Sequence, residues 1–82
     1  SVSRQQRLHS IEINPNSFVH GMRLDAIPFD KFKVELKKLR RPNMLEPIAP
    51  RPDIQLAEGD VLVLLGTNES LVAAEVFLVS GK

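Results

Sequence analysis

Few residues of this chain have the type and spacing that catalysis or metal binding would need. Ser17 and His20 stand three positions apart, but no acidic residue is placed to orient the histidine as a catalytic base. Glu58 and Asp60 flank a glycine, and two carboxylates at a turn supply only part of the oxygen shell that calcium requires. We therefore predict no catalytic residues and no metal site. His20 is expected to be a partly buried hydrogen-bonding residue, and Asp60 to bond backbone amides of its own turn.

The most basic local stretch is "KLRRPN", residues 38–43. Arginine side chains match the geometry of phosphate and carboxylate groups, so this stretch could bind an anionic ligand. It could equally be the solvated end of a hairpin, and the residues alone leave both interpretations open. Direct nucleic-acid binding is disfavoured, because 11 basic residues balance 10 acidic ones to a net charge of +1 and aromatic residues are few.

The short chain limits how the protein can be stabilised. Its 82 residues form at most one small domain, and a hydrophobic fraction of 43% is enough for a core. A domain of this size buries only about 60–65% of its unfolded surface, so it often needs added support. There is no cysteine, which excludes disulfides and cysteine-based zinc sites. A partner subunit is therefore the expected support.

The N-terminal residues 1–7, "SVSRQQR", are polar and lack periodicity, so we predict a linker or disordered N-terminus there. No apolar run approaches the ~18 residues of a membrane span, and the N-terminus does not resemble a signal peptide. We expect no direct membrane insertion of this chain. Because it begins at Ser1 without methionine, we expect a soluble piece of a longer protein.

The C-terminal third has the strongest structural pattern. Residues 61–65, "VLVLL", predict a strand that is apolar on both faces and therefore central in a sheet. A helix is predicted over residues 69–80, with Thr67 or Asn68 as N-cap and Gly81 as C-cap. Apolar residues lie almost all the way round this helix, whereas a surface helix usually has one apolar face. The second apolar side needs something to cover it.

The first half of the chain gives weaker patterns. Ile11–Glu12–Ile13 alternates as a half-buried strand does. Residues 18–27 could hold a short helix, which Pro28 would end. Gly59, in the turn "LAEGD", is expected at positive φ.

Residues 30–41 fit two structures. As a helix they would have Asp30 as N-cap; as a strand they would need a β-bulge at Lys37–Lys38, where the alternation slips by one residue. The proline-rich stretch that follows permits only an edge strand, around residues 44–48.

In order, the segments of residues 8–81 resemble the TrkA C-terminal domain, also called RCK-C (regulator of conductance of potassium). The segments that carry the resemblance are "VELKKLRR", the proline-containing "EPIAPRP", the turn "EGD", the strand "VLVLLG" and the last helix. Upstream, Gly21, Leu24 and Ile27 match the family's "G-x-x-L-x-x-hydrophobic" segment. The stretch "GDVLVLLGTNESLVAAEVFLVSG" is similar to the C-termini of Kef-type bacterial potassium-efflux or cation–proton antiporters. The four lysines within residues 31–38 depart from the family pattern.

The resemblance implies an α+β fold for residues 8–82: a small two-layer domain with a mixed β-sheet packed with helices, and a strand within residues 30–41. RCK-C domains commonly pair, so it also implies a homodimer through one side of the last helix. The other side would pack on the sheet, beneath Val61, Val63 or Leu65. The candidate dimer-interface residues are Val72, Val76, Phe77 and Val79.

The resemblance further implies a regulatory, non-enzymatic domain of a potassium or other monovalent-cation transport protein. It would lie on the cytoplasmic side of the bacterial inner membrane, attached to a membrane transport domain. No cofactor is expected, but some members of the family bind cyclic di-AMP between paired copies, so this or another nucleotide is the candidate regulatory ligand. The candidate ligand-binding residues are Arg40, Arg41, Asn43, Ile48 and Pro50.

Three other functions remain open. The chain could be a purely structural dimerisation domain without a ligand, as its apolar helix suggests. It could be the ligand-sensing domain of a transcription regulator, although it lacks a helix-turn-helix that would contact DNA. An enzyme is the least supported, for want of a catalytic constellation.

Overall fold

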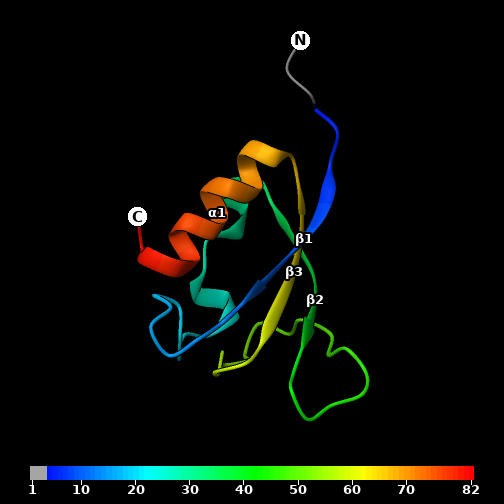
Figure 1. Ribbon diagram of the computed structural model, residues 1–82, viewed down its shortest axis with the longest axis vertical. Coiled ribbons are helices and arrows are strands. Elements are labelled where there is room, and N and C mark those ends of the chain that lie inside the picture. Colours follow the sequence, from blue (N-terminus) through cyan, green and yellow to red (C-terminus); the bar gives the residue numbers. More distant parts are fainter. Residues whose placement is uncertain (1–3) are drawn as a thin grey trace.

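The computed structural model describes residues 4–82, which form two layers. One layer is a three-stranded sheet in the order β1–β3–β2, and helices cover one face of it (Figure 1). The elements in chain order are β1 (Arg7–Glu12), the 3-10 helices η1 (Leu24–Ala26) and η2 (Phe29–Phe32), β2 (Glu35–Arg40), β3 (Val61–Gly66) and the helix α1 (Asn68–Ser80). Of the predicted N-terminal linker, residues 1–3 lie outside the described part, and β1 begins at Arg7.

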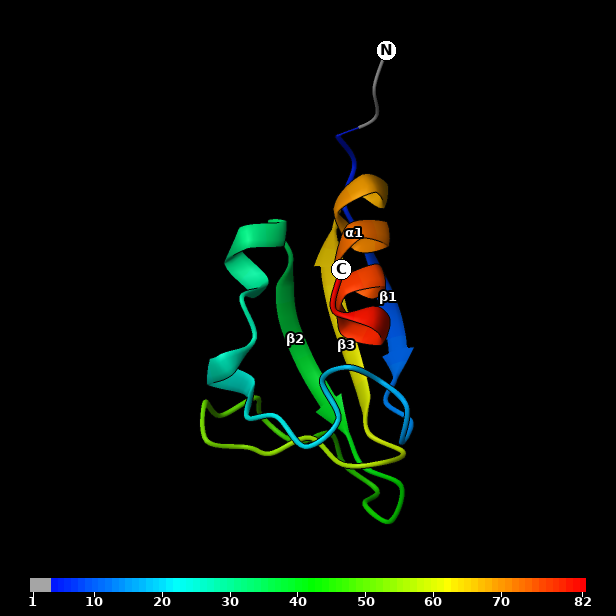
Figure 2. The same ribbon diagram turned by 90° about the vertical axis from the view of Figure 1, so that its left-hand side faces the viewer.

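The predicted α+β class and the two layers are confirmed, but the prediction of a mixed sheet is wrong. Both β1 and β2 pair antiparallel with β3, so all neighbouring strands of the described residues are antiparallel. β1 and β2 do run in the same direction, but β3 separates them. α1 packs over β1 and β3, whereas η1 and η2 lie on the β2 side (Figure 2).

β3 is the central strand, as its unbroken apolar sequence predicts. Leu62 and Leu64 are fully buried and belong to the same hydrophobic core as α1. The side chains of Val61, Val63 and Leu65 therefore alternate to the opposite face, so the prediction that they lie beneath the helix is wrong. Because both faces of this strand are apolar, the sequence pattern could not distinguish the helix side from the outer side.

α1 has the predicted ends. The Thr67 hydroxyl accepts a hydrogen bond from the Ser70 N–H at 3.2 Å, and Gly81, at φ +79°, donates its N–H to the Phe77 carbonyl at 2.8 Å. One side of α1 buries Leu71, Ala74 and Leu78 against the sheet. No helix among the described residues combines the length and the apolar character needed to cross a membrane.

The helix predicted over residues 18–27 is present only as the three-residue η1. Alternate N–H groups here bond to distant segments and interrupt the local turns: Val19 N–H donates to the Leu78 carbonyl, Gly21 N–H to that of Leu56 and Leu24 N–H to that of Ile54. Long-range hydrogen bonds therefore replace the local ones that a helix would need.

The ambiguous residues 30–41 contain both structures in turn. Phe29–Phe32 form η2, which ends at Lys33 in the left-handed conformation (φ 59°), and β2 follows. The register of β2 on β3 shifts between Leu36 and Lys38, which confirms the predicted bulge.

The edge strand predicted around residues 44–48 is reduced to one bridge, between Leu39 and Ile48. Pro47 lacks the N–H that would extend this ladder, and Leu45 beside it is 98% exposed. Gly59 has the predicted positive φ, +89°.

Candidate functional site

An open pocket of about 300 Å³ lies between η1, η2, β2 and the proline-rich loop. Its lining residues come from separate segments: Leu24, Asp25, Phe29, Leu36, Pro50 and Pro52. Five of the six are apolar, and Asp25 provides the one carboxylate. Such a surface can hold the apolar or aromatic body of a small ligand and offer it a hydrogen-bond acceptor. We call β2 with η1, η2 and residues 50–52 the pocket border.

Backbone hydrogen bonds between distant segments form the walls of the pocket. The Leu24 N–H donates to the Ile54 carbonyl at 2.9 Å, and the Asp25 N–H donates to the Pro52 carbonyl at 3.0 Å. Pro50 and Pro52 fix the backbone of the loop on the other side of these bonds. The pocket therefore depends on tertiary contacts that join η1 to a loop far along the chain.

Asp25 is oriented by Arg23. The guanidinium donates from Nε to Oδ1 at 3.1 Å and from Nη2 to Oδ2 at 2.7 Å. These hydrogen bonds lower the pKa of Asp25 and raise the pKa of Arg23. The carboxylate accordingly stays ionised near neutral pH and keeps lone pairs that a ligand N–H or O–H can meet.

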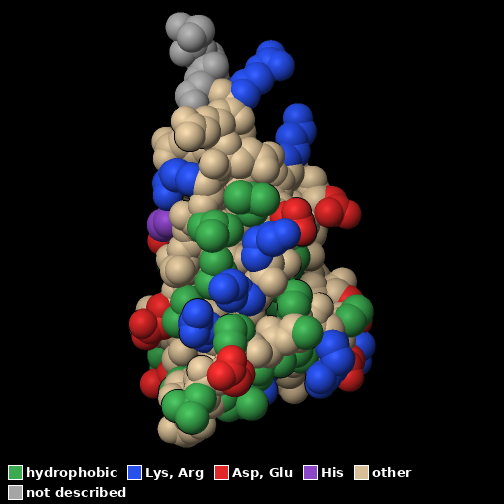
Figure 3. Space-filling model, turned by 90° about the vertical axis from the view of Figure 1, so that its right-hand side faces the viewer, with side chains coloured by type: hydrophobic (Ala, Val, Ile, Leu, Met, Phe, Trp, Pro, Cys, Tyr) green, Lys and Arg blue, Asp and Glu red, His purple; other side chains and the backbone are tan. Residues whose placement is uncertain are grey.

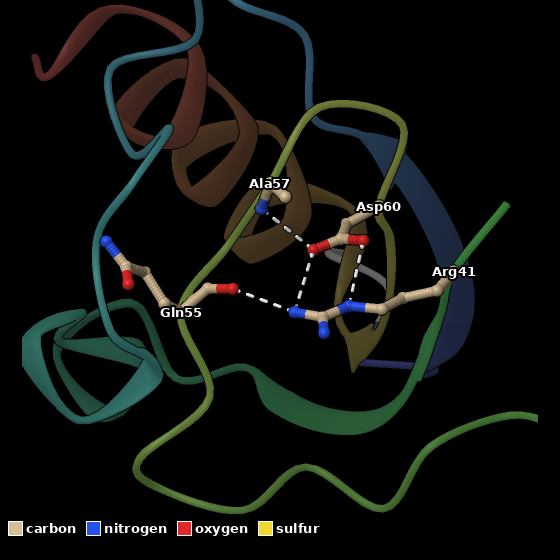
Figure 4. A network of polar contacts seen from close by, with 4 residues as sticks. All are labelled: Arg41, Gln55, Ala57 and Asp60. Carbon is tan, nitrogen blue, oxygen red and sulfur yellow. Dashed lines mark hydrogen bonds and ion pairs between the residues drawn. The ribbon is translucent and has the colours of Figure 1, made fainter.

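A second polar network fixes the end of β2 (Figure 4). The Asp60 side chain is 1% exposed and accepts a hydrogen bond from Ala57 N–H at 2.9 Å and one from Arg41 Nε at 3.2 Å. Arg41 Nη2 also donates to the Gln55 carbonyl at 2.8 Å. The bond to Ala57 confirms that Asp60 holds its own turn. The guanidinium of Arg41, a candidate ligand residue, therefore has its hydrogen-bond partners within the protein.

The candidate ligand residues are separated by the fold. Pro50 lines the pocket, whereas Ile48 pairs with Leu39 and packs against the core. Arg40 and Asn43 are exposed outside the pocket lining. Arg40 is paired with Val61 on the outer face of the sheet, where basic side chains are interspersed with hydrophobic and acidic ones (Figure 3).

Sequence reasoning missed five of the lining residues. The sequence places Leu24 in a possible helix and in the family's segment, and Leu36 within the ambiguous residues 30–41, without assigning either to a site. Asp25 and Pro52 carry no signal beyond the proline-rich composition. The available clue is that three segments of uncertain structure contain the lining residues: residues 18–27, residues 30–41 with the preceding Phe29, and the proline-rich loop.

The candidate interface residues of α1 divide into two groups. Val72, Val76 and Val79 are 56%, 47% and 49% exposed. Phe77 is half-buried, and its ring lies 5.5 Å from that of Phe18 and 5.1 Å from that of Phe32. The three valines are available to a partner, whereas Phe77 joins α1 to η2.

The residues considered for catalysis and metal binding have other roles. The Ser17 hydroxyl accepts from Asn14 N–H and donates to Asn14 Oδ1, and His20 meets Ser17 through a backbone hydrogen bond. His20 is exposed, so the prediction of a partly buried histidine is wrong: its turn directs the side chain outward. Among residues 4–82 no cluster of three or more histidine, cysteine or acidic side chains could hold a metal ion.

The comparisons with known proteins agree with this architecture. The family model described as the TrkA-C domain matches residues 8–78. The chain belongs to the TrkA-C domain family. No curated protein matches it.

Two solved structures share the fold. The crystal structure of the GsuK RCK domain superposes with a TM-score of 0.77 at 17% identity, covering 92% of this chain and 16% of that one. The GsuK channel bound to NAD gives a TM-score of 0.74 at 18% identity, covering 94% and 14%. The chain thus corresponds to about one sixth of the length of these proteins.

Proposed function

We propose that this chain is a regulatory domain of a potassium or other monovalent-cation transport protein, in which it senses a small ligand and pairs with a second copy. Membership in the TrkA-C domain family and the likeness to an RCK domain of a channel support this role. The observation that carries the ligand-sensing part is the open, mostly apolar pocket with one oriented carboxylate.

A nucleotide suits the pocket as a ligand class. The apolar walls can contact the face of a base, and Asp25 can accept a hydrogen bond from an amino group on its edge. Arg51 stands between the two lining prolines, and its ion pair with Asp53 is long, at 3.5 Å, so it could meet a phosphate at the rim. Cyclic di-AMP, or NAD as in the channel structure, are the first compounds to test.

Such a domain would act by a difference in affinity. A ligand shifts the equilibrium of the attached transport domain only if it binds one arrangement of the paired domains more tightly than the other. The parent we propose is a Kef-type antiporter or related protein, with this domain on the cytoplasmic side of the bacterial inner membrane. The role is binding and regulation, without catalysis.

The test is the thermal unfolding midpoint of the chain with cyclic di-AMP, NAD, adenine mononucleotides, glutathione and divalent cations. At about 100 times its Kd, a ligand stabilises the folded state by about 2.7 kcal/mol. For a domain of this size the midpoint should rise by about ten degrees or more. We expect Asp25→Asn to reduce the shift, and Glu12→Gln, an exposed change on β1, to leave it unchanged.

A second candidate function is a structural dimerisation domain without a ligand. The exposed Val72, Val76 and Val79 favour it, since they need a partner whether or not the pocket is used. If no compound shifts the midpoint while the chain still pairs, this second function replaces the first.

A further inference from the structure

We propose that the copies meet through β1 and α1 together, with the two β1 strands pairing antiparallel into one sheet and the two α1 helices packing side by side. This inference rests on the pairing in the proposed function and specifies its surface. We call β1 with Val72, Val76 and Val79 the α1–β1 border.

β1 is an open edge. It pairs with β3 in an uninterrupted register from Arg7–Gly66 to Glu12–Val61, and among residues 4–82 no strand pairs with its other side. It contains no proline or bulge, which are devices that protect edge strands. The β2 edge differs, because the Leu39–Ile48 bridge and Pro47 occupy and end it. Within residues 4–82, the β1 edge alone presents a regular row of backbone groups to a partner strand.

The three exposed valines lie on the same side of the molecule as this edge. At 100° per residue, Val72, Val76 and Val79 fall within about 60° of one another on the helical wheel. Two neighbours fix the direction of this stripe. Glu75 marks the β1 side, because its Oε1 lies 2.7 Å from His9 Nε2, and Phe77 marks the η2 side through its contact with Phe32.

The valine stripe is nearer to the β1 side. On the wheel, Val79 and Val72 lie about 40° and 60° from Glu75, but about 160° and 140° from Phe77, while Val76 lies about 100° from both and points outward. The stripe therefore points outward and toward β1, away from the pocket border. Figure 2 shows α1 and β1 together along one side of the molecule, with the 3-10 helices along the other.

One two-fold axis can satisfy both elements. If the axis stands perpendicular to the sheet at the β1 edge, the strands run antiparallel and both helices remain on the same face. Strands spaced about 4.8 Å apart would place the β1–β3 midline of each copy about 4.8 Å from the axis. Because α1 packs over β1 and β3, the two α1 axes would be about 10 Å apart, at the upper end of the 8–10 Å range of packed helices.

Charge favours the same arrangement. Antiparallel pairing brings the Arg7 end of one β1 strand beside the Glu12 end of the other, and because Arg7 and Glu12 point to opposite faces of the sheet, the attraction acts between the strand ends and not as a cross-strand side-chain pair. α1 carries Glu69 and Glu75 but no basic residue, which is unsuited to an anionic membrane surface. Glu75, which also faces this border, already has His9 as its partner. A second copy therefore fits this surface better than a lipid bilayer.

The first test is Val72→Lys, which places two lysines, one from each copy, in the α1–α1 contact of a symmetric dimer. A loss of at least tenfold per copy multiplies to about 100-fold in the dimer dissociation constant, measured by sedimentation equilibrium. Leu45→Lys is the matched control, because Leu45 is 98% exposed in the loop after β2 and should leave the constant unchanged. Circular dichroism checks that both variants fold.

The second test uses the absence of cysteine. Ser10 lies near the middle of β1 on the outer face, where the two-fold axis would place it opposite Ser10 of the second copy, so mild oxidation of Ser10→Cys should give a covalent dimer. Leu45→Cys should not cross-link. If the wild-type chain pairs and Val72→Lys pairs equally well, or if the Ser10→Cys variant does not cross-link, the copies meet elsewhere: the inference is overturned and pairing stands. If the wild-type chain stays monomeric at about 1 mM, both fail, while the ligand test remains independent.

Discussion

The two long borders of the sheet differ in where the backbone N–H and C=O groups find their hydrogen-bond partners. At the α1–β1 border, regular elements run to the edge and leave a row of backbone groups beside an apolar helix stripe. At the pocket border, loops and 3-10 helices bond across the edge, and prolines end the ladder. A regular edge is complementary to another regular edge, whereas an irregular one leaves a hollow suited to a small molecule. The same sheet can thus serve assembly on one side and sensing on the other.

The largest expected effect comes from breaking the network behind the pocket border. Asp60→Ala leaves the Arg41 charge and the Ala57 N–H without their partner in a buried site. Removing one member of a buried ion pair costs about 3–5 kcal/mol, and the partial exposure of Arg41 puts the expected loss of unfolding free energy near 3 kcal/mol. Urea unfolding measures it.

The control for this prediction is Asp53→Ala, which breaks the exposed pair with Arg51 and should cost less than about 1 kcal/mol. If the two borders are independent, folded Asp60→Ala protein should lose ligand-induced stabilisation while its dimer dissociation constant stays unchanged. Equal unfolding energies for the two variants would show that the Asp60 network does not stabilise the turn.

An intermediate loss of unfolding free energy is expected from substitutions at two glycines. Both have positive φ, but they belong to different borders. Gly81 (φ +79°) ends α1, and Gly21 (φ +84°) donates its N–H to Leu56 on the pocket side. A Cβ at Gly81 would lie 2.6 Å from Phe18 Cδ1, whereas one at Gly21 meets nothing within 4 Å. We expect Gly21→Ala to cost about 1 kcal/mol from its positive φ, and Gly81→Ala about 2 kcal/mol from φ and the close contact.

The difference between these two variants, measured by urea unfolding, isolates the contact with Phe18. Phe18 also donates its N–H to the Val79 carbonyl at 2.9 Å, so a displaced ring would loosen the end of the valine stripe. Gly81→Ala should therefore weaken pairing more than Gly21→Ala does. Equal costs would mean that Phe18 moves aside freely and does not fix this end of α1.

The local patterns on both sides of the sheet could be predicted from the sequence, and the pocket could not. The apolar run of β3, the caps Thr67 and Gly81, and the bulge in β2 are local patterns, and the structure contains each of them. The pocket depends on hydrogen bonds such as Asp25 N–H to the Pro52 carbonyl, which join residues far apart in the chain. No local period encodes such a bond. The sequence predicted that Arg41 could bind an anion, but the fold was needed to show that this anion is the carboxylate of Asp60.

The smallest effect on stability is expected from breaking the Arg23–Asp25 ion pair at the rim of the pocket. Arg23 lowers the pKa of Asp25 through two hydrogen bonds, so Arg23→Ala should raise the pH midpoint of the Asp25 titration. The chemical shift of the Asp25 carboxyl carbon, measured by NMR as a function of pH, reports this midpoint. A carboxyl whose folded pKa is depressed contributes stability above its unfolded pKa, and loses it as the pH falls through the lower folded value. The contribution is small because both side chains are exposed.

The control for this titration is Arg51→Ala, which removes a cation of the pocket border that has no hydrogen bond to Asp25. It should leave the midpoint of the Asp25 titration unchanged. A ligand that donates a hydrogen bond to Asp25 should bind more weakly once the carboxyl is protonated, at a pH below the ordinary value of 3.8. Removing Arg23 should extend that weakening to higher pH. Without ligand, the dimer dissociation constant should not follow the Asp25 titration, since this carboxyl lies at the pocket border and the proposed interface lies across the sheet. A common pH dependence of ligand binding and pairing would instead show that the two borders are coupled.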